Sequence, residues 1–350
     1  MAFNHRKFIA LLALAILPIS FIIALSFGTI NIAFSDVILS LLPNSEDSQS
    51  NLVIEQIRFP RALLALSVGA ILGICGAATQ GLFRNPLADP SLIGVTAGAT
   101  VGSALTIYFS NHLLSLYSIS GIALVSFGAF IGGALAVGLV YSLATSSSQS
   151  RTSNASGATS VATMLLAGIA ITAIAGSVTS LTEFFADNEV LRRISLWRMG
   201  GLDGANIERL SFALLSLVIV LLFLPRNSTA LNALLLGESE ARHLGINIQK
   251  TKLSIILLVA LGVGICVSLA GSIAFVGLVV PHIIRLLIGP DHRWLLPMSA
   301  LGGAILLLLA DTVARTILSP IELPVGLVTA LIGAPFFISL LRRRHDYGMR

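Results

Sequence analysis

Charge is scarce in this sequence. Charged residues make up 11% of its 350 residues, whereas they make up about 25% of an ordinary soluble domain. Hydrophobic residues reach 55%, and the mean hydropathy is +0.94. No soluble domain has this balance, so the composition predicts a chain that lies largely inside a lipid bilayer.

Reactive and metal-binding groups are also missing. The two cysteines, Cys75 and Cys266, both lie inside apolar stretches, where we expect a packing role and no disulfide. The six histidines do not pair at metal-ligand spacing such as H-E-x-x-H, and the sequence has no G-x-S-x-G nucleophile motif. The sequence therefore predicts neither an enzyme nor a metal site.

The sequence has no energy source of its own. None of the three lysines, Lys7, Lys250 and Lys252, follows a glycine, which excludes a phosphate-binding loop. Carboxylates inside the apolar stretches, which proton or sodium coupling would ordinarily require, are few. One of them, Asp311, precedes Arg315 by four residues, a spacing typical of a local ion pair on a helix. Transport would therefore be passive or powered by another subunit.

The sequence does contain many apolar stretches long enough to cross a bilayer, which takes roughly 20 helical residues. Nine are clear. A tenth is shorter, is interrupted by Pro281, and is either a short span or a half-helix; we favour a short span. The predicted spans are 8–27, 62–83, 92–109, 116–144, 160–184, 210–224, 253–270, 275–288, 295–317 and 325–341. The sequence thus predicts an all-α polytopic membrane protein, with residues 1–350 in a single transmembrane domain.

Glycines four residues apart recur in these stretches, for example at Gly69 and Gly73 and at Gly98 and Gly102. This spacing lets two helix backbones approach closely. It predicts a dense helix bundle and says nothing about a substrate.

Lysine and arginine are distributed unequally between the loops. With both termini in the cytoplasm, about twice as many lysines and arginines lie on the inner side as on the outer side, as the positive-inside rule requires. The net charge of +5 then reflects membrane orientation, and nucleic acid need not be invoked. A secretory signal peptide is the alternative for the first stretch, but no small-x-small cleavage site follows it. The orientation leaves an outer group of arginines, namely Arg58, Arg61, Arg192, Arg193, Arg198, Arg209 and Arg315.

A polar segment, RNPLADP, separates the second and third spans and begins with Arg84, Asn85 and Pro86. Its prolines end the preceding helix, and Asn85 or Asp89 could cap the next one. Structural capping is the preferred interpretation, and direct contact with a substrate is the alternative.

Residues 226–252 form a long segment on the predicted inner side. The middle of the segment, LNALLLGESEARHLGI at 231–246, is amphipathic. Helical spacing places Leu231, Leu234, Leu235 and later Leu244 where they could pack on the membrane domain, and turns the charges outward. A solvated surface helix and a helix that docks on a partner fit this pattern equally well.

Several motifs together resemble the permease subunits of bacterial ABC importers for iron chelates and vitamin B12, the FecCD-type family. They are RFPR at 58–61, QGLFRNPLADPSLIGVTAGA at 80–99, WRMGGLDGA at 197–205, LNALLLGESEARHLGI at 231–246, GSIAFVGLVVPHIIRLLIGPDHRWLLP at 271–297 and ELPVGLVTALIGAPFFISLL at 322–341. The resemblance covers essentially the full length. It implies ten transmembrane helices in the type II ABC importer fold, arranged in the bacterial inner membrane as a homodimer around a translocation path.

The resemblance also implies an energy source in two cytoplasmic ABC ATPase subunits. ATP and Mg²⁺ would bind there, and this chain would be a non-catalytic permease with no cofactor. Segment 231–246 would supply the coupling helices, and Pro281, His282 and Arg285 fit an inner-side hinge or an ATPase contact. The residues expected to contact the ATPase are Leu235, Leu236, Glu238, Glu240 and Arg242.

On the outer side, the resemblance implies that acidic residues of a periplasmic substrate-binding protein dock on Arg58 and Arg61 of the R-x-P-R motif. Arg315 matches a third docking site less closely. Arginine–carboxylate contacts of this kind orient two proteins and speed their association. The alternative from the residues alone is that these arginines anchor helix ends at the lipid headgroups.

The substrate is predicted from the outer segment RRISLWRMGGLDGA. Arg192, Arg193 and Arg198 lie around Trp197 in this segment, which suits an anionic, planar ligand such as haem with its propionates. The segment is also similar to haem permeases of the family, although B12 permeases carry similar sequences. Haem is therefore the preferred substrate, with a ferric siderophore or cobalamin as alternatives. A secondary transporter and an intramembrane enzyme are the alternatives from other classes.

Overall fold

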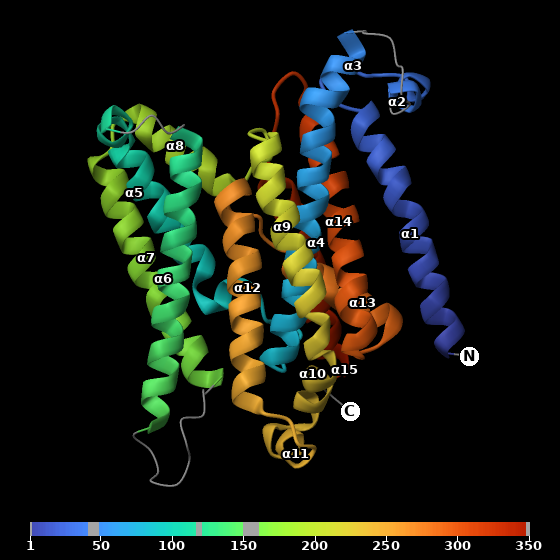
Figure 1. The fold of residues 1–350 in the computed structure, drawn as a ribbon, viewed down its shortest axis with the longest axis vertical. Helices are drawn as coiled ribbons and strands as arrows, with labels where there is room; N and C mark the ends of the chain where they lie inside the picture. Colours follow the sequence, from blue (N-terminus) through green and yellow to red (C-terminus); the bar gives the residue numbers. More distant parts are fainter. Residues whose placement is uncertain (1, 41–48, 117–120, 150–160, 348–350) are drawn as a thin grey trace.

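The computed structural model describes residues 2–40, 49–116, 121–149 and 161–347, whose regular structure is entirely helical (Figure 1). In these residues, seven helices are long and apolar enough to cross a membrane, and three shorter apolar helices accompany them. Together they correspond to the ten predicted spans. The ten are α1 (Ala2–Ser26), α4 (Phe59–Leu82), α5 (Val95–Leu116), α6 (Gly121–Gln149), α7 (Val161–Phe185), α9 (Ile207–Phe223), α12 (Ile248–Ala270), α13 (Val276–Ile288), α14 (His292–Thr316) and α15 (Val325–Tyr347).

The remaining helices are short and lie near the two ends of the bundle (Figure 1). At the end that we call outer lie α2 (Phe34–Ser40), α3 (Gln49–Val53), the π-helical turn η1 (Ile54–Arg58) and α8 (Asn188–Met199). At the inner end lie η3 (Pro225–Asn227), α10 (Ser228–Leu236) and α11 (Glu238–His243). The start of α1 and the end of α15 also lie toward the inner end. A further 3-10 turn, η2 (Pro90–Ile93), precedes α5.

Helix α4 is at the centre of the fold. It packs against α14, α13, α9 and α12, and 89% of its most apolar stretch is buried, compared with 17% for α1 at the edge. Its small residues allow close packing against α14. A Cβ built on Gly73 would lie only 2.1 Å from the carbonyl oxygen of Ser299, so there is room only for glycine. The two backbones therefore touch, as the glycine spacing predicted.

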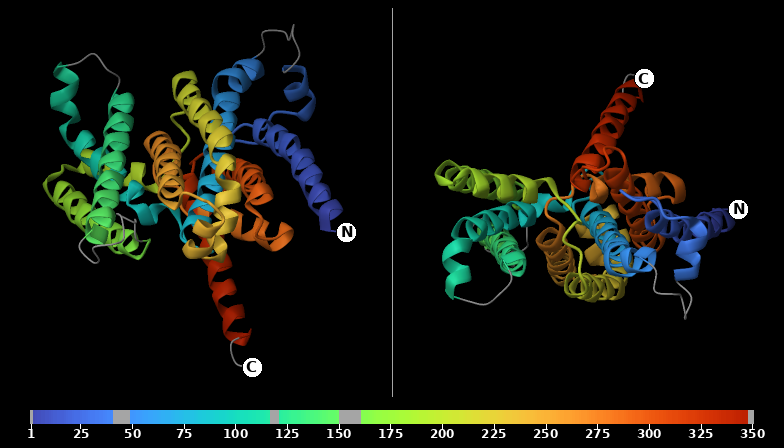
Figure 2. Two further views of the ribbon diagram at one scale, coloured as in Figure 1. Left: turned by 60° about the horizontal axis from the view of Figure 1, so that its bottom comes forward. Right: turned by 90° about the horizontal axis from the view of Figure 1, so that it is seen from above.

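Helices α5, α6 and α7 form a second group, which contacts the first through α12. The predicted glycine pattern recurs here, where a Cβ on Gly102 of α5 would lie 2.0 Å from the carbonyl oxygen of Gly128 on α6. Figure 2 shows α15 projecting beyond the other helices. Leu331 and Ile338 on this helix are exposed, so it presents an apolar face that the described residues leave uncovered.

Helix α13 occupies the tenth predicted stretch, and the choice between a short span and a half-helix stays open. Its 13 residues extend over only about 20 Å, less than the roughly 30 Å of a bilayer core. The residue before it, Phe275, has a φ of 68°, which a side chain other than glycine rarely adopts. Residues 271–275 thus turn sharply before the helix begins.

The RNPLADP segment forms a capped turn between α4 and α5. The Asp89 carboxylate accepts the N–H of Ser91 at 2.8 Å and caps η2, the 3-10 turn that precedes α5, whereas the sequence predicted a cap on the next span itself. The Asn85 side chain accepts the N–H of Leu87 at 3.0 Å. Arg84 is exposed with a φ of 50°, and Pro86 is half-buried. These contacts lie within the turn itself.

Candidate functional site

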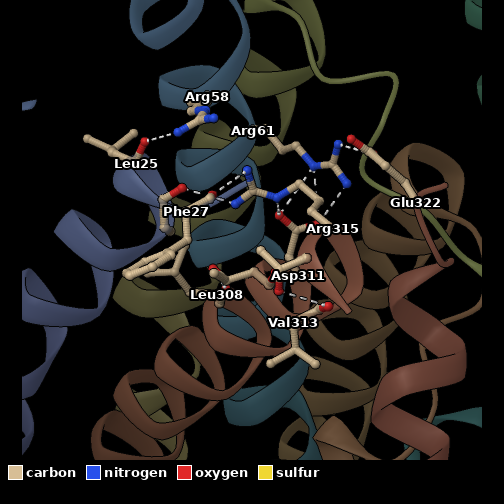
Figure 3. Close-up of polar contacts among 12 residues, drawn as sticks. Leu25, Phe27, Arg58, Arg61, Leu308, Asp311, Val313, Arg315 and Glu322 are labelled. Carbon is tan, nitrogen blue, oxygen red and sulfur yellow. Dashed lines mark hydrogen bonds and ion pairs between the residues drawn. The ribbon is translucent and has the colours of Figure 1, made fainter. Parts of the chain in front are cut away.

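Five charged side chains gather where the outer ends of α4 and α14 meet (Figure 3). We call Arg58, Arg61, Asp311, Arg315 and Glu322 the outer cluster. Asp311 lies at its centre, with Arg61 Nη2 3.0 Å from Oδ1 and Arg315 Nε 3.0 Å from Oδ2. The predicted ion pair between Asp311 and Arg315 is therefore confirmed, and Arg61 adds a link from α4 that the spacing did not predict.

Arg61 also ties in the segment that leads to α15. Its Nη1 lies 2.7 Å from Glu322 Oε2, and the Glu322 side chain is 36% exposed. One guanidinium thus joins α4 to α14 and to the residues just before α15. Only the Glu322 end of this contact is open to an outside partner.

Arg58 and Arg315 bind the C-terminal end of α1. Arg58 Nη1 donates to the carbonyls of Leu25 (2.6 Å) and Ser26 (2.8 Å), and Arg315 Nη2 donates to that of Ala24 (3.0 Å). The last carbonyls of a helix have no partners within it and form the negative end of its dipole, so two cations there are stabilising. The three arginines predicted to dock the binding protein are thus buried and bonded within the chain, and their docking role stays a prediction.

A cavity of about 490 Å³ lies beside the outer cluster. Arg61 and Glu322 line one side of it, and Arg193, Trp197 and Arg209 are also on its wall. Two of the predicted substrate residues, Arg193 and Trp197, are therefore brought together at one cavity. The guanidinium groups and the indole on its wall suit a ligand with an anionic group and a flat apolar body.

The other two predicted substrate residues, Arg192 and Arg198, are exposed and do not line the cavity. Arg198 instead pairs with Glu183 at 2.8 Å. Arg209 and Asp203 line the cavity but were not predicted there. The sequence did carry a signal for Arg209, because it belongs to the outer arginines that the orientation of the chain left unexplained.

At the inner end, α10 and α11 form the predicted amphipathic segment. Leu231 and Leu234 are buried, whereas Leu235 and Leu236 are 43% and 69% exposed. Leu244 is also exposed, so its predicted packing, like that of Leu235, is wrong. The chain turns at Gly237, where φ is 123°, so the helical spacing of the residues before it does not continue to Leu244.

The charged residues of this segment divide into two kinds. Glu238 Oε1 lies 2.8 Å from Lys252 Nζ and joins α11 to the buried start of α12. Glu240 and Arg242 are exposed, as is Leu236 at the end of α10. The segment therefore presents an apolar tip with charges around it at the inner end.

Helix α13 carries three further predicted residues. Pro281 is buried, Arg285 is half-buried, and the His282 ring lies edge-on to Phe336 of α15 at 6.4 Å between centroids. Their predicted hinge or ATPase role stays a prediction. Across the described ranges, no group of three or more histidine, cysteine or acidic residues could hold a metal ion, and Cys75 and Cys266 are both free and buried.

Comparison with known proteins places these features in a family. Residues 16–343 match the model of the FecCD transport family. The hemin transport system permease HmuU of Yersinia pestis is 44% identical over 83% of each chain, and the cobalamin import permease BtuC of Halobacterium salinarum is 42% identical over 84% of this chain and 74% of its own. A solved chain of an ABC transporter in an inward-facing conformation superposes with a TM-score of 0.82 and 33% identity, covering 96% of this chain and 99% of that one.

Proposed function

The chain belongs to the FecCD transport family and is the permease of an ABC importer, and on that premise we propose that it carries haem. The observation that carries the proposal is the outer cavity, whose wall includes Arg193, Arg209 and Trp197. Guanidinium groups bind carboxylates such as propionates, and an indole ring stacks on a flat macrocycle. The 44% identical relative is named for hemin transport, which supports the same substrate.

We propose that two copies of the chain assemble around the path, with both termini in the cytoplasm. The distribution of lysine and arginine supports this orientation, and the apolar face of α15 supports a second copy as its neighbour. ATP hydrolysis would take place on two separate ATPase subunits, whose nucleotide-driven closure would switch the path from outward to inward facing.

The test of the substrate is uptake into liposomes that hold the permease with its ATPase and binding protein. We expect ATP-dependent uptake of haem, and no comparable uptake of a ferric siderophore or of cobalamin. Cobalamin belongs in the comparison because a 42% identical relative is named for its import. Uptake of another ligand in place of haem would refute the substrate, and uptake of none would refute the substrate class.

The cavity makes a residue-level prediction for haem uptake. Arg193→Ala removes a guanidinium from the cavity wall, whereas Arg192→Ala removes its exposed neighbour on the same helix. Loss of one such contact costs about 1–2 kcal/mol, so we expect Arg193→Ala to lower uptake at subsaturating haem roughly tenfold. Arg192→Ala should leave uptake unchanged. Equal effects of the two substitutions would show that the cavity is not part of the path.

Docking of the binding protein is proposed at the rim of the same cavity. The Arg61 guanidinium is already paired with Glu322, and Glu322 is the partly exposed partner. An acidic residue of the binding protein could replace Glu322 on Arg61, which would keep the cation paired throughout. Association should then weaken steeply with rising salt. An affinity that does not change with salt would count against docking on these arginines.

The apolar tip of α10 and α11 is proposed to enter a cleft on the ATPase. Leu236 is the most exposed leucine of α10, and burying a leucine contributes about 1.5–3 kcal/mol. We expect Leu236→Asp to abolish co-purification of the ATPase, because it would bury an unpaired charge. Leu236→Met should preserve co-purification. An ATPase that still binds the Leu236→Asp variant would place the contact elsewhere.

A further inference from the structure

A polar contact joins α10 to α14 at the inner end. We call Asn232, Asp291 and His292 the inner joint. Asn232 Nδ2 donates to Asp291 Oδ1 at 2.7 Å, and Asn232 Oδ1 accepts the backbone N–H of His292 at 2.9 Å. Asp291 is the N-cap of α14 and His292 is its first residue. One side chain of the coupling segment therefore holds the start of α14.

The histidine ring completes the joint. Its Nδ1 lies 2.8 Å from the same Asn232 oxygen. Because the backbone N–H of His292 can only donate, the atom that it contacts is the amide oxygen, and Nδ1 must therefore carry a proton. His292 is 1% exposed, so the ring is fixed inside the protein.

Helix α4 closes the joint from the other side. A Cβ on Gly81 of α4 would lie 2.4 Å from His292 Nε2 and 3.0 Å from Leu231 Cδ2. The ring and the leucine thus rest against bare backbone. Helices α4, α10 and α14 meet at one packed point, and a displacement of α10 must displace the other two.

The α4–α14 pair extends from this point to the outer end. The backbones touch at Gly73 and Ser299 along the way. At the far end, Arg61 of α4 is bonded to Asp311 of α14. The pair therefore has the inner joint at one end and the outer cluster at the other.

We propose that Asn232 is a positioning residue that transmits movement of the α10–α11 tip to the α4–α14 pair. Closure of the ATPase would then reach the outer cluster, and docking there would be reported back to the ATPase. Packed side chains, hydrogen bonds and rigid helices of this kind can carry coupling between two distant sites. The inference rests on the proposed function, because it requires an ATPase at the exposed tip.

The first test compares Asn232→Ala with Thr229→Ala, an exposed position on the same helix. Both are measured in liposomes with the ATPase and the binding protein. We expect the Asn232→Ala complex to assemble, to hydrolyse ATP within twofold of the basal rate, and to lose stimulation by the binding protein. Uptake should fall at least tenfold, while Thr229→Ala behaves like the wild type. Uptake and hydrolysis that fall in parallel, or uptake that is unchanged, would overturn the inference.

A donor–acceptor exchange keeps the test independent of folding. Asn232→Asp alone sets two carboxylates at the 2.7 Å contact and should uncouple the complex. Adding Asp291→Asn restores an amide–carboxylate hydrogen bond, and asparagine is also a good N-cap. We expect the double variant to recover at least half of the wild-type uptake. A double variant that assembles without such recovery would refute the role of Asn232.

A measurement without substrate separates this inference from the proposed substrate. Ile321 is exposed beside Glu322 of the outer cluster, and the two native cysteines are buried, so Ile321→Cys offers a single site for a fluorophore. We expect ATP to change its signal in the wild-type background and not with Asn232→Ala. A response that persists in the variant, or is absent from both, would overturn the inference even if haem is transported. Failure of haem uptake with the expected signals would refute only the substrate.

Discussion

Replacing Asp311 with alanine is expected to destabilise the protein by about 3–5 kcal/mol, because it leaves two buried guanidiniums without their shared carboxylate. Arg61 and Arg315 each lie 3.0 Å from this side chain, which has no exposed surface. Total stabilities of folded domains are only about 5–15 kcal/mol. A denaturant titration of the purified permease in detergent measures this loss of stability.

Glu322→Gln is the matched control for Asp311→Ala. Glu322 binds the same arginine at 2.7 Å, but its side chain is 36% exposed. Ion pairs open to solvent contribute only about 0–1 kcal/mol, so this substitution should hardly change the unfolding midpoint. Equal losses from the two substitutions would mean that burial of Asp311 does not determine its contribution.

The outer cluster also shows where inference from one sequence ends. The pair Asp311 and Arg315 could be predicted because helical spacing brings residues four apart together. Arg61 and Asp311 are 250 residues apart, and nothing in either local sequence refers to the other. The partners of Arg58 within the chain could not be predicted, since they are backbone carbonyls, which every residue has. Local periodicity therefore predicts individual helices, whereas the contacts between helices can be seen only once the fold is known.

The same division holds at the inner end. Apolar spacing predicted that segment 231–246 is amphipathic, and the structure buries Leu231 and Leu234 accordingly. The turn at Gly237 ended that periodicity, which is why the placement of Leu244 was wrong. In the sequence, Asn232 is an ordinary polar residue on a helix, and its partners Asp291 and His292 follow 59 and 60 residues later. The ten spans, in contrast, needed only hydropathy, because a bilayer core imposes length and composition on each one separately.

The contact between α4 and α14 leads to a second large effect, at Gly73. An alanine there would place its Cβ 2.1 Å from the Ser299 carbonyl oxygen and 3.3 Å from the Gly303 Cα. Since a carbon and an oxygen approach no closer than about 3.3 Å, the two helices would have to separate by about 1 Å. Overpacking of this kind costs about 1–3 kcal/mol, and we expect Gly73→Ala to lie at the upper end because backbone cannot move aside as a side chain can.

Gly138→Ala on α6 provides the control for Gly73→Ala, because a Cβ at Gly138 would meet nothing within 4 Å. Alanine is favoured over glycine inside a helix by about 0.5–1 kcal/mol, so this variant should be as stable as the wild type or slightly more stable. The same denaturant titration compares the two. If Gly73→Ala unfolded at the same denaturant concentration as Gly138→Ala, α4 and α14 would not be in backbone contact. The α4–α14 pair could then not serve as the rigid connection between the inner joint and the outer cluster.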